Sequence, residues 1–217
     1  MERLFYIIEP AVDTKETGKA FPAVESYENY DFKSADSVHH LDYHSFPDFI
    51  PDIRFKLAKT AKICDMMSQA AISARGFLIS EKLKLIFESI ANQIIPHRFY
   101  PATIEDHDGV FHTFFWMHFV WEEGKDLPDY KKSKFIVRKF SKVEGYLEIE
   151  NYTDYLAKKE EIGFIKRIDF EHLFIKQPDY EIFSFPLDVN IYSTSKVIPE
   201  FDNCSGISIT PSTKLSI

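Results

Sequence analysis

Hydrophobic and polar positions alternate with the period of a β-strand over much of the chain. The segment Ile53–Leu57 alternates apolar with charged residues, which is typical of a strand exposed on one face. The apolar stretch 110–121 follows an Asp-Gly turn at 107–109, and that pattern favours a β-hairpin. Both faces of this stretch are rich in aromatic residues, so we expect a central strand. Further strands are expected over 4–8, 97–104, 135–140, 145–149, 163–175 and 180–185.

A single apolar stripe predicts a helix after Ser80. Leu83, Ile86, Phe87 and Ile90 follow at the spacing that places side chains on one helix face. Ser80 is positioned to accept a hydrogen bond from the first turn, so we expect it to cap the helix.

Two segments share one order of elements: a strand that ends in serine, a helix that begins there, and a second strand. The first lies near 76–103 and the second near 188–211. Pro199 falls within the second supposed helix, so that helix must be short or broken there. One more helix is expected over 152–161. Without a regular βαβ alternation, the chain predicts an α+β fold, mostly antiparallel sheet with two or three helices.

Length and charge limit the organisation and the class of partner. The 217 residues suit a single domain, 1–217, or two lobes, 1–125 and 126–217, that share one core. The net charge is −8, and the first 52 residues alone contain 11 acidic and 4 basic side chains. This field disfavours nucleic acid and favours a partner with a basic surface. The alternative is that acidic loops only keep the protein soluble.

Cysteines and apolar runs indicate a cytoplasmic protein. Cys64 and Cys204 form no CxxC pair, so we expect two unreactive thiols, although a disulfide between them is not excluded. The first residues are predicted not to form a signal peptide, because their apolar run of five is too short. The longest apolar-rich stretch has 12 residues, fewer than the roughly 20 that span a bilayer, so we expect no membrane association.

Serines between a strand and a helix could be hydrolase nucleophiles. Such a nucleophile needs glycines two residues to either side, and Ser80 instead has Leu78 and Lys82. We interpret Ser80 and Ser193 as helix caps.

Histidines offer no clear metal or catalytic pattern. His39, His40 and His44 lie near acidic residues, but without a helical pattern or an HExxH motif we expect a solvent-facing loop. His112 and His118 are expected to be hydrogen-bonded residues of the sheet. The sequence therefore predicts no catalytic residue, no metal site and no cofactor.

The segment 11–52 shows little periodicity. An unstructured loop of about 40 residues is unusual in a compact domain, so its aromatic side chains should dock on the core. The aromatic residues concerned are Phe21, Tyr27, Tyr30 and Phe32.

The first repeated unit carries a resemblance to a known family. Residues 79–83 (Ile-Ser-Glu-Lys-Leu) and 99–102 (Phe-Tyr-Pro-Ala) resemble the eleventh immunity family of bacterial polymorphic toxin systems, formerly a domain of unknown function. The second unit is similar to the family's ending at Ser193, Lys196, Val197, Phe201, Gly206 and Ile207. It lacks the acidic residue after its serine. The resemblance implies a cytoplasmic antitoxin that blocks a cognate toxin domain, without catalysis or a cofactor.

We therefore predict an immunity protein that binds its toxin stoichiometrically through the acidic region. The residues expected to contact the toxin are the carboxylates Glu25, Glu28, Asp31, Asp36, Asp42 and Asp48, with Tyr27, Tyr30 and Tyr43 as anchors. Two alternatives stay open. One is a hydrolase-like enzyme with a pocket that contains His112 or His118, and the other is an interaction module that self-associates through its aromatic surface.

Overall fold

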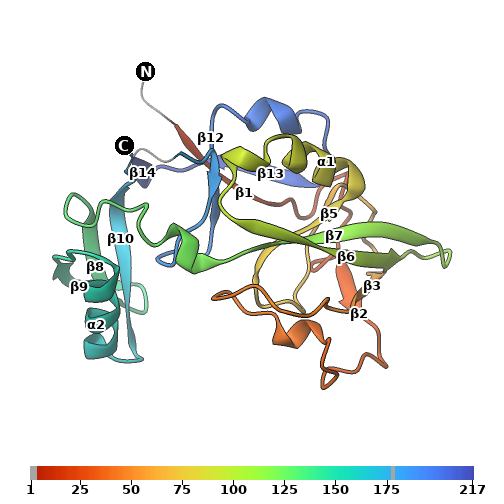
Figure 1. Cartoon of the computed structure of the whole chain (residues 1–217), viewed down its shortest axis with the longest axis horizontal. Helices are drawn as coiled ribbons and strands as arrows, with labels where there is room; N and C mark the ends of the chain where they lie inside the picture. Colours follow the sequence, from red (N-terminus) through yellow and green to blue (C-terminus); the bar gives the residue numbers. More distant parts are fainter. Residues whose placement is uncertain (1–3, 177–178) are drawn as a thin grey trace.

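The computed structural model describes residues 4–176 and 179–217 and contains three β-sheets and two α-helices (Figure 1). The largest sheet has the strand order β2-β3-β6-β7-β5-β4, and only the pair β3–β6 is parallel. Its strands are β2 (Val24–Ser26), β3 (Ile53–Leu57), β4 (Met66–Met67), β5 (Arg75–Ser80), β6 (His97–Glu105) and β7 (Phe111–Phe119). The predicted α+β class with mostly antiparallel sheet is confirmed.

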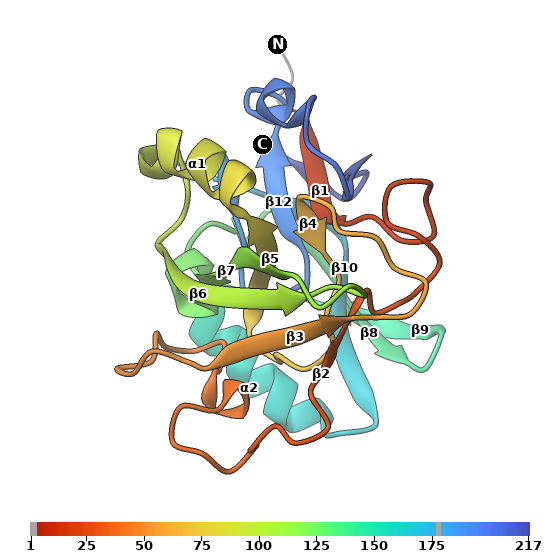
Figure 2. The same ribbon diagram turned by 90° about the vertical axis from the view of Figure 1, so that its right-hand side faces the viewer.

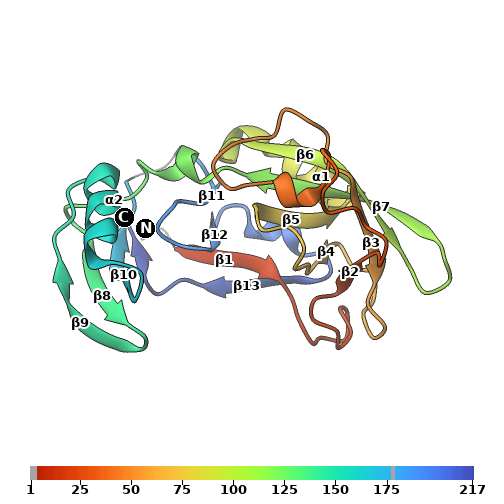
Figure 3. The same cartoon turned by 90° about the horizontal axis from the view of Figure 1, so that it is seen from below.

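Two four-stranded sheets complete the fold. The middle sheet has the order β11-β12-β1-β13 and is antiparallel throughout. Its strands are β1 (Phe5–Pro10), β11 (Ile182–Phe183), β12 (Ile191–Thr194) and β13 (Ile207–Pro211). The end sheet has the order β14-β10-β8-β9. Its strands are β8 (Lys134–Lys139), β9 (Lys142–Leu147), β10 (Lys166–Phe174) and β14 (Leu215–Ser216). Seen from below, the middle sheet lies between the other two (Figure 3).

The first predicted unit, near 76–103, is confirmed as β5, helix α1 (Glu81–Ser89) and β6. Ser80 caps α1, because its side chain accepts a hydrogen bond from the backbone N–H of Leu83. Leu83, Phe87 and Ile90 of the predicted stripe are buried, and Ile86 is half-buried. Strand β7 lies between β5 and β6, which makes this a split unit.

The second unit, near 188–211, also has two strands separated by a third strand, but a 3-10 turn replaces the α-helix in its connection. Its strands β12 and β13 are both antiparallel to β1, which lies between them. The predicted helix is a single 3-10 turn, Ile198–Phe201, with Pro199 in its first positions, so the expected shortening is confirmed. The prediction that Ser193 caps this helix is wrong. Ser193 is fully buried within β12, and its hydroxyl donates to the carbonyl of Thr194.

The predicted hairpin and central strand are also confirmed. β6 and β7 pair along their whole length, and β7 is bordered by β5 on its other side. Pro101 does not interrupt the ladder between β3 and β6, because β3 joins β6 only from Ala102 onward.

The six-stranded sheet has an apolar cluster on each face. One cluster contains Phe77, Ile79 and Phe119 and continues through α1 into the other two sheets. The other contains Leu78, Ile104 and Trp116 and is covered by segments from 20–74. The covering chain includes the region 11–52, whose only regular elements are β2 and a 3-10 turn, Val38–His40.

The aromatic side chains of this covering region dock only in part. Tyr30 is 8% exposed, and Tyr27 packs against the cluster. Phe21 and Phe32 are 73% and 39% exposed, so the prediction that they dock on the core is wrong. Phe21 precedes the buried residues Ala23 and Val24, whereas Phe32 packs on the rings of Tyr30 and His39 at the surface.

The end sheet is covered by helix α2 (Tyr152–Ile162) (Figure 1). Asn151 caps this helix through a hydrogen bond from the N–H of Asp154. No helix in the described part of the chain is long and apolar enough to cross a membrane.

Candidate protein-interaction surface

We call residues 25–52 the acidic loop. It runs below the six-stranded sheet and is drawn in orange in Figures 1 and 2. It contains seven acidic side chains and one lysine. Because the loop has almost no regular structure, side-chain hydrogen bonds and buried apolar residues must fix its path.

Tyr30 is the main internal support of the loop. Its hydroxyl donates to the carbonyl of Asp52 at 2.7 Å and accepts from the N–H of Val38 at 2.9 Å. The backbone N–H of Asp52 also donates to the carbonyl of Asp36. The two ends of the loop are thereby held together, and Val38 and Leu41 are buried beneath them.

His118 fixes the loop to the central strand β7. Its Nε2 lies 2.7 Å from the backbone carbonyl of Asp42, so Nε2 carries the proton and Nδ1 is the unprotonated nitrogen. Nδ1 is buried and has no partner among the described residues. Nearby, the Tyr43 ring packs on Trp121 with centroids 4.1 Å apart. The loop is therefore held against the sheet at its middle.

Replacing His118 with glutamine should reduce the loss of stability on mild acidification. Burial lowers the pKa of His118, so the folded state resists protonation that the unfolded chain accepts. This contribution to stability is complete above the unfolded pKa of about 6.5 and is lost as the pH falls below it. Urea unfolding between pH 7.5 and 5, values chosen to bracket that pKa, should show a smaller drop in the variant.

His107→Gln is the matched control, because His107 is exposed in the hairpin turn. It should keep the wild-type pH dependence. His97 will contribute a remaining slope in the same window, because burial lowers its pKa too. Equal slopes in wild type and His118→Gln would contradict the assignment of His118 as the neutral support of the loop.

All six predicted carboxylates of the loop are exposed: Glu25, Glu28, Asp31, Asp36, Asp42 and Asp48. None of them forms an ion pair with another residue in the described ranges. By contrast, Asp52 at the end of the loop pairs with Arg54 at 2.6 Å. The loop therefore presents negative charge that the protein itself does not neutralise.

Three of these carboxylates also stabilise turns of the loop. Asp31 accepts from the N–H of Lys33, and Asp36 hydrogen-bonds to Ser34. Asp42 accepts from the N–H groups of residues 44 and 45. Burial alone would raise the pKa of Asp42, but these two hydrogen bonds outweigh it and lower the pKa. Glu25, Glu28 and Asp48 make no such bonds within the described chain.

The predicted tyrosine anchors differ in availability. Tyr30 is buried and fully engaged, so the structure does not support it as a contact for a partner. Tyr27 is half-buried, and its hydroxyl donates to Glu105 at 2.6 Å. Tyr43 is half-buried against Trp121. Exposed apolar side chains are instead Phe32 and Ile50, at 39% and 73%. Sequence reasoning missed both, because an aromatic or aliphatic residue in a polar loop gives no sign of which side it faces.

The three loop histidines make separate contacts. His39 packs on Phe32, His40 reaches the carbonyl of Ser34, and His44 pairs with Glu122 at 2.8 Å. The described residues include no group of three or more His, Cys, Asp or Glu side chains placed to hold a metal ion.

Ser80 takes part in a structural junction. Its hydroxyl donates to Asp65 at 2.8 Å. The same carboxylate accepts from the N–H and hydroxyl of Ser205, at 2.8 and 3.1 Å, and pairs with Lys82 at 3.3 Å. Asp65 thus connects the start of α1 with the loop before β13, and it joins the two split units.

A shallow depression of about 530 Å³ beside this junction is also lined by His112. A hydrolase would need His112 to accept the proton of Ser80. Instead His112 pairs with Asp106 at 2.7 Å, while Ser80 is bonded to Asp65. The serine and the histidine therefore each have a different aspartate as partner, and this arrangement does not favour the hydrolase alternative.

Both cysteines are free thiols, Cys64 buried and Cys204 half-buried. Burial raises the pKa of Cys64 to about 11 and also raises that of Cys204, so neither is an activated nucleophile.

Comparison with known proteins adds no relative. No family model matches the sequence, and no curated protein matches it significantly.

Proposed function

We propose that this chain is an immunity protein that binds a toxin domain with a basic surface in the cytoplasm and blocks it without catalysis. The observation that carries the proposal is the acidic loop: six exposed carboxylates that no described cation neutralises. Unpaired surface charge of one sign steers a partner of the opposite sign and raises the association rate. The motif resemblance of the first split unit supports the same function.

The exposed apolar residues of the loop suit an interface. Stable interfaces combine a few well-placed apolar or aromatic anchors with a polar rim. Phe32 and Ile50 supply the apolar contacts, and the carboxylates supply the rim. Because His118 and Tyr30 hold the loop in one conformation, binding costs little ordering of the chain.

A triple neutralisation of the loop should weaken toxin binding. Glu25→Gln, Glu28→Gln and Asp48→Asn remove charges that make no local bonds, so the fold should be unchanged. Where a toxin domain is encoded beside the gene for this chain, that domain is the probe, and we expect a roughly 10- to 100-fold loss of affinity, mostly through a slower association rate. The salt dependence of association should also decrease. Surface plasmon resonance at several salt concentrations measures both.

The matched control removes the same charge elsewhere. Glu148 and Glu150, between β9 and α2, and Glu161 of α2 are exposed and form no ion pair within the described chain. Their triple replacement by glutamine should leave affinity near wild type. Equal losses in the two triple variants would refute a contact through the acidic loop, and wild-type protein that fails to rescue cells expressing the toxin would refute the immunity function.

A further inference from the structure

A cavity of about 490 Å³ lies between strands β1 and β5, and Tyr43 of the acidic loop forms part of its wall. Three of its lining residues have a buried N–H group without an acceptor in the described chain: Nε of Arg75, Nε1 of Trp116 and Nε1 of Trp121. Trp116 is only 1% exposed. Buried polar groups almost always have a partner, so three unsatisfied donors around one cavity require an explanation.

The sheet edges create this space. Strand β4 pairs with β5 only at Ile79 and Leu78, so β5 has no neighbour on that side from Arg75 to Phe77. On the opposite wall, β1 pairs with β12 only as far as Ile8. Gly76 permits the close approach of Trp116, because a Cβ there would lie 2.7 Å from the indole ring.

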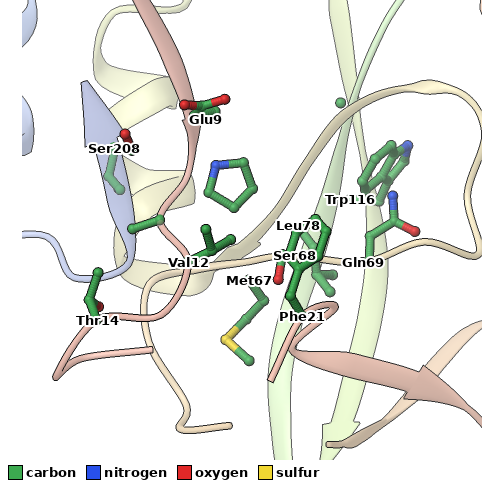
Figure 4. A pocket seen from close by; sticks show the side chains of 14 residues that line it. Glu9, Val12, Thr14, Phe21, Met67, Ser68, Gln69, Leu78, Trp116 and Ser208 are labelled. Carbon is green, nitrogen blue, oxygen red and sulfur yellow. The ribbon is translucent and has the colours of Figure 1, made fainter. Parts of the chain in front are cut away.

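A second cavity of about 630 Å³ adjoins the first and shares part of its wall. Figure 4 shows this second cavity, with Glu9 and Ser208 on one side and Trp116 and Gln69 on the other. Volumes of 300 to 1,000 Å³, approximately, are typical of small-molecule sites.

Arg75 carries the only positive charge of the first cavity. Burial lowers its pKa to about 10, so it remains a cation at neutral pH. Its single hydrogen bond is long, 3.5 Å from Nη2 to the backbone carbonyl of Asp188, and its guanidinium packs on Trp121. The Asp188 carboxylate is engaged by the hydroxyl of Tyr192 and the N–H of Asn190. No described carboxylate forms an ion pair with Arg75.

We propose that this cavity binds a small molecule with one carboxylate on a flat apolar body. The carboxylate pairs with the guanidinium of Arg75, and a shift of the two indole rings on binding brings their N–H groups, which have almost no accessible surface in this structure, within reach of it. The body lies among apolar side chains such as Pro10 and Phe77. Glu9, exposed in the wall, disfavours anions of higher charge such as phosphate esters. The cavity shares Tyr43 with the acidic loop, but its test uses the isolated chain and does not depend on the toxin.

Binding at this site can be followed by intrinsic tryptophan fluorescence, because the only two tryptophans of the sequence, Trp116 and Trp121, both line the cavity. The probe is 3-phenylpropionate, with 3-phenylpropionamide as the neutral analogue and inorganic phosphate as the alternative anion. We expect a saturable change of tryptophan emission with the acid, and binding at least about 10-fold weaker for the amide. The peptide Gly-Gly-Phe, with a free carboxylate, tests whether a chain terminus is the source; tighter binding of this peptide would overturn the small-molecule proposal.

Arg75→Met removes the guanidinium donors but keeps an apolar side chain. It should lower the affinity for 3-phenylpropionate roughly 10- to 100-fold. Trp121→Phe removes one indole N–H and should lower this affinity by less. Arg98→Met is the matched control, since Arg98 also packs on an aromatic ring and bonds a carbonyl at 3.5 Å, but outside the cavity. It should bind the acid like wild type.

Three results would overturn the proposal: no saturable emission change with the acid into the millimolar range, equal affinity for acid and amide, or unchanged affinity in folded Arg75→Met. If Arg75→Met does not fold, the affinities of the wild-type chain for 3-phenylpropionate and 3-phenylpropionamide test the proposal on their own.

Discussion

Replacing Phe87 with alanine should lower the free energy of unfolding by about 4 kcal/mol, the largest effect we expect from one side chain. Phe87 is fully buried in α1 and packs on Phe77 of β5 and on Phe201 of the second unit, with ring centroids 6.3 and 5.5 Å apart. The substitution leaves a cavity where the two split units meet. Urea unfolding followed by circular dichroism and by tryptophan emission measures the loss.

Leu85→Ala on the same helix is the control. Leu85 is 60% exposed, so its replacement should change stability by less than about 0.5 kcal/mol. Similar losses for the two variants would indicate that helix propensity, rather than packing between the units, determines the stability of α1.

Asp65→Ala should lower the free energy of unfolding by about 3 kcal/mol, because a half-buried carboxylate with several hydrogen bonds is removed. The variant leaves the hydroxyls of Ser80 and Ser205, the N–H of Ser205 and the ammonium of Lys82 without their common acceptor. The same urea experiment at neutral pH measures it. A loss below about 1 kcal/mol would contradict the role of Asp65 as the junction of the two units.

The effect of Asp65 should depend on pH. Burial opposes ionisation, but the hydrogen bonds from Ser205 and Ser80 and the charge of Lys82 outweigh it, so the pKa of Asp65 lies below its usual value. Its stabilising contribution is present above the unfolded pKa of about 3.9 and is lost as the pH falls through the lower folded pKa. The difference between wild type and variant should therefore shrink below about pH 4. Asp48→Asn, which removes an exposed carboxylate, should show no such convergence.

The elements that local patterns specify were predictable. The first split unit follows from the apolar stripe and the cap at Ser80, and the hairpin follows from the Asp-Gly turn. Ser193 has a similar sequence context but lies within a strand, because β12 is completed by pairing with β1, residues about 185 positions away. Pairing between such distant segments leaves no trace in a local pattern.

The candidate surface was predictable where charge alone decides exposure. An isolated carboxylate rarely stays buried, so the six acidic side chains are on the surface as expected. Tyr30 and Phe32 were not distinguishable, since both are aromatic residues in one polar segment. Their burial depends on how the loop crosses the sheet, which the contact between His118 and the Asp42 carbonyl helps to set.

The cavity between β1 and β5 was not predictable at all. Arg75 begins β5, Trp116 is in β7, and Trp121 follows that strand, so nothing in their sequence spacing indicates a common site. It exists because β4 is two residues long, and strand length at a sheet edge is decided by tertiary packing.

The insertion of β1 between β12 and β13 has a consequence during synthesis. Both strands that pair with β1 in the described chain lie within residues 191–211, so this apolar strand emerges from the ribosome long before either can pair with it. Contacts between such distant residues slow folding, and an unpaired strand in the meantime is prone to intermolecular association. The middle sheet can therefore close only after residues 207–211 have been translated.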